Sequence, residues 1–194
     1  MARPREFDKQ DVINRAMLVF WERGYEATSI RDLIDVMGIS SSSMYEAFGD
    51  KRGVFLAALE HFCELERGQI ARMAEDSASP ELFIQGLFGS IEAAVQSKSP
   101  AQGSLAFNTM VEYGTRDPGV TELLLTHYFG IAAIIADVIR QGQAQGTVAS
   151  RQDPLHLTYA ILSALHGVAA VKGVKPDFPH VAAITQVVVK LLQV

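Results

Sequence analysis

The sequence has a single cysteine and no excess of basic over acidic residues. The first fact limits disulfide bonding, and the second limits non-specific binding to nucleic acids. Cys63 is the only cysteine in 194 residues, which excludes an intramolecular disulfide and favours a reducing compartment. The chain has 17 Lys and Arg residues against 22 Asp and Glu residues, a formal net charge of −5. This balance gives no electrostatic indication of a nucleic-acid partner. Any contact with DNA must therefore come from a few locally placed cations and from helix ends.

Sequence patterns of enzyme sites are also missing. The chain contains no G-x-S-x-G, no G-x-x-x-x-G-K-[ST] and no G-x-G-x-x-G pattern after a strand. No two histidines have the H-x-x-x-H spacing of a metal site on one helix. The five histidines are scattered at His61, His127, His156, His166 and His180. We therefore expect neither enzymatic activity nor a metal or other cofactor.

Targeting and membrane-spanning segments are not evident either. Residues 1–6 lack the apolar stretch of a signal peptide. Residues 155–174 approach membrane-spanning length, but this stretch includes His156, His166 and Lys172. Since charged groups are costly inside a bilayer, we interpret the stretch as a buried helix and expect a soluble cytoplasmic protein with no membrane partner.

Helical periodicity dominates the chain, and strand-like alternation is absent. Capping residues mark helix starts at Asp8, Ser29, Ser40 and Asp50, and Gly24 and Gly38 mark helix ends. Further helices are predicted at about 79–97, 103–113, 117–146, 153–173 and 177–192. We predict an all-α fold of about nine helices. Residues 1–53 would form one domain of three helices, and residues 54–194 a second, larger helical domain.

The segment 29–55, SIRDLIDVMGISSSSMYEAFGDKRGVF, carries the functional signal. Two short helices are separated only by Gly38-Ile39, and the second keeps Met44 and Phe48 on its inner face. This layout is typical of a helix-turn-helix, whose second helix enters the major groove of DNA. Small hydroxyl side chains at the start of that helix allow a close approach to the duplex, and Glu46 can accept a hydrogen bond from a cytosine amino group.

Positive helix ends and nearby cations predict the phosphate contacts. The helix starts at Thr28-Ser29 and at Asp50-Lys51-Arg52 offer backbone N–H donors to phosphates. Arg3-Pro4-Arg5 is a short basic arm that either reaches a neighbouring groove or is a solvated tail. The predicted DNA-binding residues are Thr28, Ser29, Ser40, Ser41, Ser42, Ser43, Tyr45, Glu46 and Lys51.

Over roughly residues 8–60 the sequence resembles the TetR family of transcriptional regulators. The matching residues are Phe20, Gly24, Tyr25, Thr28, Ser29, Ile30, Leu33, Gly38, Ile39, Ser40, Met44, Tyr45, Phe48 and Lys51. Asp35 departs from the pattern near a position where the family often has alanine. The resemblance implies that Tyr45 and Lys51 anchor the DNA backbone, while Ser41, Ser42, Ser43 and Glu46 face bases.

The resemblance also implies a homodimer in which the last two helices pair with those of a second chain. Small residues recur at four-residue spacing in 157–171, as close helix packing requires, and the last helix has an apolar face. An intrachain core is the alternative. The predicted interface residues are Leu157, Ala160, Ile161, Ala164, Val168, Ile184, Val187, Val188 and Leu191.

The resemblance to the TetR family further implies a pocket for a small-molecule effector in the middle helices. Its predicted lining mixes aromatic, Met and polar side chains, as small-molecule clefts do, although each residue is also a candidate for plain core. The predicted residues are Phe62, Leu87, Phe107, Asn108, Met110, Val111, Tyr128, Leu162 and His166. Ser104, in the segment 101–108, stands where one branch of the family has a sensing cysteine, so thiol sensing does not carry over to this position.

Together these features predict a homodimeric repressor that a small molecule of unknown identity releases from a palindromic double-stranded operator. A ligand-responsive activator is an alternative. A helical interaction module without DNA binding is another, but it leaves the segment 40–51 unexplained. The helix that begins at Asp50 would join the DNA reader to the effector pocket and transmit the ligand's effect.

Overall fold

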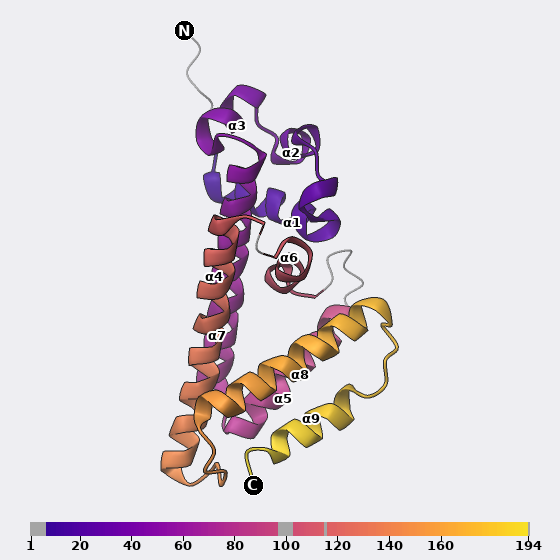
Figure 1. The fold of residues 1–194 in the computed structure, drawn as a ribbon. Helices are drawn as coiled ribbons and strands as arrows, with labels where there is room; N and C mark the ends of the chain where they lie inside the picture. Colours follow the sequence, from indigo (N-terminus) through magenta and orange to yellow (C-terminus); the bar gives the residue numbers. More distant parts are fainter. Residues whose placement is uncertain (1–6, 97–102, 115, 194) are drawn as a thin grey trace. The chain divides into compact units, whose positions relative to one another are not determined.

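The computed structural model describes residues 7–96, 103–114 and 116–193. These residues contain nine helices and no strand, which confirms the all-α prediction (Figure 1). The helices are α1 (Lys9–Ala27), α2 (Ile30–Met37), α3 (Ser41–Phe48), α4 (Lys51–Asp76), α5 (Pro80–Gln96), α6 (Leu105–Tyr113), α7 (Pro118–Gln145), α8 (Pro154–Val174) and α9 (Val181–Lys190).

The helices form two compact units. The first comprises Met1–Leu65 with Ser104–Leu123, and the second comprises Glu66–Gly103 with Leu124–Val194. Both α4 and α7 run from one unit into the other. The domain boundary that the sequence predicts after residue 53 lies inside α4, whereas the first unit continues to Leu65 and also includes α6.

Helix α1 begins where its sequence predicts, but at Gly24, its predicted end, it bends and continues to Ala27. The Asp8 carboxylate accepts a hydrogen bond from the Gln10 N–H at 2.8 Å and so caps the first turn. Phe20 is fully buried against Phe55 of α4, with ring centroids 5.0 Å apart. Gly24 has a φ of 76° and interrupts the helical backbone, so the last residues of α1 continue after a kink.

Helices α2 and α3 are held by local caps and by buried apolar side chains. The Ser29 Oγ accepts from the Asp32 N–H at 3.1 Å, and the Asp32 carboxylate accepts from the Ser29 N–H at 2.8 Å. This reciprocal pair is the predicted capping box. Gly38 ends α2 in the left-handed conformation at φ 68°, which a residue with a Cβ rarely adopts. Met44 of α3 is fully buried and fixes that helix to the unit.

The core of the second unit lies among α5, α7, α8 and α9. Phe83 and Phe88 of α5, Ile135 of α7, Ile161 of α8 and Val188 of α9 belong to one buried apolar cluster. Burial of these large side chains supplies most of the free energy that holds the four helices together.

The predicted start of the last helix at Asp177 is wrong. Helix α9 begins at Val181, and its N-cap residue His180 makes no side-chain capping hydrogen bond. Pro179 explains the difference, because proline has no N–H and disfavours helical backbone at the residue before it. The preceding residues instead form a turn in which the Phe178 N–H donates to the Lys175 carbonyl at 2.9 Å.

Two helices in the described ranges, α7 and α8, are long and apolar enough to cross a membrane by length and composition alone. The core helices of water-soluble proteins pass the same test. Ile135 and Ile139 of α7 and Ile161 of α8 are buried in the core of the second unit, and the sequence analysis expects burial of this kind for residues 155–174.

Candidate nucleic-acid interface

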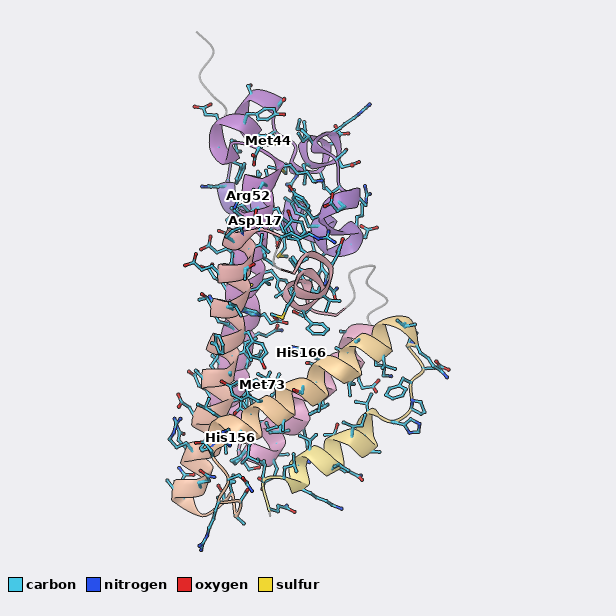
Figure 2. All side chains as sticks on the ribbon, in the orientation of Figure 1. Met44, Arg52, Met73, Asp117, His156 and His166 are labelled. Atoms are coloured by element: carbon cyan, nitrogen blue, oxygen red, sulfur yellow. The ribbon has the colours of Figure 1, made fainter. Side chains whose placement is uncertain are left out.

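The outer face of α3 is polar and exposed, and a buried methionine on its inner face holds the helix to the unit. Ser41, Ser42, Tyr45 and Glu46 are exposed, and 46% of the Tyr45 surface remains accessible. Met44, between them in sequence, is fully buried (Figure 2). A helix anchored along one side and polar along the other can lie in a groove of DNA without unfolding its own domain.

The serine run at the start of α3 forms its own hydrogen-bond network. The Ser40 Oγ accepts from the Ser43 N–H at 3.1 Å and lies 2.9 Å from the Ser42 Oγ and 2.8 Å from the Ser43 Oγ. Ser40 therefore holds the first turn in place. Because hydroxyl groups both donate and accept, the exposed Ser41 and Ser42 can bond to phosphates or to base edges.

Three cations of the first unit are candidates for phosphate contacts, and one of them, Arg31, has the Asp35 carboxylate 4.0 Å away. The Lys51 Nζ lies 4.3 Å from the centroid of the Tyr25 ring, and the Lys9 Nζ lies 5.6 Å from that of the Phe48 ring. Arg31, in the first turn of α2, has a side chain that is 92% exposed. The sequence reasoning found Lys51 but missed Lys9 and Arg31. The signal available for Arg31 was a basic residue in the first turn beside the cap at Ser29.

Arg52, by contrast, is committed to an ion pair within the unit. Its guanidinium forms two hydrogen bonds with the Asp117 carboxylate, with Nη2 donating to Oδ1 at 2.8 Å and Nε donating to Oδ2 (Figure 2). These hydrogen bonds outweigh the effect of burial and hold the pKa of Asp117 well below its usual range. Asp117 Oδ1 also accepts from the Gly119 N–H at 2.8 Å, so the pair ties the start of α4 to the start of α7.

Thr28 differs from the other predicted DNA-binding residues. Its side chain is buried, at 1% exposure, and its hydroxyl donates to the Gly24 carbonyl at 2.7 Å. Its N–H donates to the Tyr25 carbonyl at 3.3 Å. Thr28 thus shapes the turn before α2 and leaves no side-chain group for a phosphate. Ser29 is exposed, but its Oγ and N–H take part in the capping box.

The nine predicted effector residues lie in both units. Phe62 is buried on α4, while Phe107, Asn108, Met110 and Val111 lie on α6, and these five belong to the first unit. The second unit holds the rest, which are Leu87, Tyr128, Leu162 and His166.

Of that second group, Tyr128 and His166 lie close together, with ring centroids 6.0 Å apart. Burial lowers the pKa of His166, and the nearby Glu66 carboxylate acts in the opposite direction. His127, the neighbour of Tyr128 in sequence, is buried and places its Nε2 2.8 Å from the Glu66 carboxylate. The second unit therefore has aromatic and titratable side chains on α4, α7 and α8.

Four of the predicted dimer residues are covered within the chain itself. Leu157, Ile161, Val168 and Val188 belong to the buried cluster of the second unit. At these positions the alternative of an intrachain core describes the structure. Ala160, Val187 and Leu191 are exposed, and Ala164 and Ile184 are half-buried.

The fold and the outer face of α3 define a helix-turn-helix DNA-binding regulator, and comparison with known proteins identifies its family. The chain matches the bacterial regulatory proteins, tetR family, over residues 12–58 and the tetracyclin repressor-like C-terminal domain over residues 83–186. It belongs to the TetR family of transcriptional regulators.

Curated relatives agree with this assignment. The chain is 33% identical to the HTH-type transcriptional regulator YezE of Bacillus subtilis over 61% of either protein. It is 25% identical to the HTH-type transcriptional repressor ComR of Escherichia coli over 86% of this chain and 80% of ComR. These relatives are named as transcriptional regulators, which are not enzymes.

Solved structures share the fold over nearly the whole length. A cysteine mutant of the TetR family regulator CifR, in complex with a 26-bp double-strand operator DNA, matches with a TM-score of 0.79 and 26% identity, over 99% of this chain and 98% of CifR. The reduced form of NemR from E. coli matches with a TM-score of 0.85 at 12% identity, over 92% of this chain and 93% of NemR, which shows the fold alone.

Proposed function

We propose that the protein is a homodimeric repressor that binds a palindromic operator through α3 and is released by a small-molecule effector. The observation that carries the proposal is the outer face of α3, where Ser41, Ser42, Tyr45 and Glu46 are exposed around the buried anchor Met44. The operator-bound CifR structure and the repressor name of ComR support the proposal. The cytoplasm is the compartment where such a regulator meets its DNA.

In this proposal, backbone contacts and base contacts come from different residues. Tyr45 of α3 and Lys51 at the start of α4 contact phosphates, with Arg31 and Lys9 as additional phosphate ligands. Ser41, Ser42 and Glu46 face the base edges, and Ser40 and Ser43 hold the first turn in place. Phosphate contacts set the register of the protein on the duplex, and base contacts set the sequence preference.

The homodimer rests on exposed apolar side chains of α8 and α9. Val187 of α9 is 63% exposed, and Tyr159 and Val171 of α8 are 37% and 41% exposed. The exposed small residues Ala160 and Gly167 let a second helix approach the α8 backbone closely. The interface proposed here uses these residues in place of the four that are buried within the chain.

Sedimentation of two variants tests the dimer. Val187→Lys puts a charge into the proposed interface and should convert the protein from dimer to monomer, because an unpaired charge in an apolar interface costs several kcal/mol. Val111→Lys on α6 is the matched control, since Val111 is 72% exposed and lies outside that surface. A wild-type monomer at micromolar concentration, or a dimer in both variants, contradicts the proposal.

The proposed release from the operator requires a binding site for the effector, which we assign to the second unit. Tyr128 and His166 in the second unit carry the aromatic and polar groups that a small-molecule cleft uses. An effector that binds one conformation more tightly shifts the protein away from the operator-bound form. Fluorescence anisotropy of a labelled operator, followed with and without a metabolite library, tests this step, and release by a compound should be lost in Tyr128→Ala. If the protein instead activates transcription, operator binding will persist in the presence of the effector.

A further inference from the structure

The first compact unit contains a cavity of about 310 Å³ among α1, α4 and α6. Of the residues that the sequence predicts for the effector pocket, only Asn108 lines it. Five of its twelve lining residues are aromatic, namely Phe20, Trp21, Tyr25, Phe55 and Tyr113. Its volume is at the lower end of the range for small-molecule sites, so it suits a compact ligand.

The Glu112 carboxylate lies at the wall of this cavity, close to Gly24. The carboxylate oxygens of Glu112 lie 3.1 and 3.2 Å from the point where a Cβ would be on Gly24. A side chain on residue 24 would crowd this carboxylate, and Gly24 also has the positive φ that forms the kink. Among the described residues no cation pairs with the Glu112 carboxylate within salt-bridge distance.

The residues that line the cavity include more acids than bases. Glu22 and Glu112 both line it, and Arg23 is the basic residue of the lining. Arg23 is already paired with Asp32, at 3.4 Å. Aromatic rings add to the negative potential, because each ring face carries partial negative charge and attracts cations.

Two aromatic side chains of the wall have polar properties that matter for a ligand. The Tyr25 ring already accepts a cation, since the Lys51 Nζ lies 4.3 Å from its centroid. The indole Nε1 of Trp21 is buried and has no hydrogen-bond partner within the described structure. A buried donor without a partner is unfavourable, but Nε1 has almost no accessible surface, so a molecule in the cavity touches other atoms of the Trp21 ring.

We propose that this cavity binds a small organic cation of the alkylammonium class, at a site separate from the effector residues of the second unit. The Glu112 carboxylate is the counter-charge for the ligand, and the aromatic part of the lining contacts its alkyl groups. Because the cavity is lined by both α1 and α6, the ligand links α6 to the helix that packs against α2.

Intrinsic fluorescence of the full-length protein tests the proposal, since Trp21 is the only tryptophan. Choline is the cationic probe, and 3,3-dimethylbutanol is its neutral counterpart with the same shape and hydroxyl group. Choline should change the Trp21 emission, and the change should saturate at a choline concentration in the millimolar range or below. The neutral compound should bind at least about fivefold more weakly, because it lacks the charge interaction, worth about 1 kcal/mol near a protein surface.

Two variants separate the site from general effects of charge. Glu112→Gln should weaken choline binding about fivefold, whereas Glu122→Gln, an exposed acid on α7 outside the lining, should leave it unchanged. Thermal unfolding confirms that both variants are folded. The absence of a saturable response to choline, equal binding of the neutral compound, or unchanged binding by Glu112→Gln each overturns the proposal. No DNA is present, so the outcome is independent of operator binding.

Discussion

Replacing Glu46 by glutamine should change which base pair the protein prefers at one position of each operator half-site. Glu46 is exposed on α3, one helical turn after Ser42. A carboxylate only accepts hydrogen bonds, and the donors in the major groove are the amino groups of cytosine and adenine. Beside the DNA phosphates an unpaired carboxylate is costly, so we expect it to face a cytosine. A glutamine amide both donates and accepts, which matches adenine.

The size of this change follows from the energy of one specific contact. A well-placed side-chain contact to a base discriminates against the wrong base by about 1–3 kcal/mol, which is about 5- to 150-fold in affinity. Selection from a pool of random duplexes, followed by anisotropy titration of the selected sites, measures the preference. Glu60→Gln, an exposed acid on α4, controls for the altered net charge. An identical base preference in wild type and Glu46→Gln refutes the assignment of Glu46 to a base.

Three further variants test the cations, the caps and the internal ion pair. Lys51→Ala should weaken binding to every DNA sequence and lower the slope of log K against log salt by about 1 per protomer, whereas an unchanged slope argues against a phosphate contact. Ser29→Ala removes an N-cap acceptor and should cost about 1 kcal/mol, or a fall of about 2–4 °C in Tm by calorimetry. Asp117→Asn should lower Tm at neutral pH. Because Arg52 depresses the folded-state pKa of Asp117, its stabilisation is present above the ordinary aspartate pKa of about 3.9 and is lost as the pH falls below it. The difference in Tm should therefore shrink in acid, and a constant difference contradicts this origin.

Local signals in the sequence predict the helix-turn-helix well. The caps at Asp8, Ser29 and Ser40 and the end of α2 at Gly38 all lie where the sequence places them. These features depend on contacts within a few residues, so the sequence alone can specify them. The start of α9 was predicted wrongly because the Asp177 capping signal was given more weight than the restriction that Pro179 imposes on the backbone.

Features that depend on distant parts of the chain were not predictable in the same way. The sequence marks Arg52 only as part of a helix start, and nothing near it in the chain indicates that its side chain pairs with Asp117, 65 residues further along. Apolar spacing on α8 does not distinguish a face buried in its own chain from a face that meets a partner. Leu157 and Ile161 lie on a face that is buried in its own chain. The predicted arm at Arg3 and Arg5 lies outside the described residues.

The most direct test of the account is whether the outer face of α3 selects the DNA sequence. Random duplexes are enriched with the wild-type protein and with a Ser42→Ala, Glu46→Ala double variant whose Tm is first shown to match. The wild type should enrich an inverted repeat, and the double variant should lose that preference while keeping its salt-dependent binding through the lysines. Enrichment of the same repeat by both proteins would contradict the claim that α3 reads the operator.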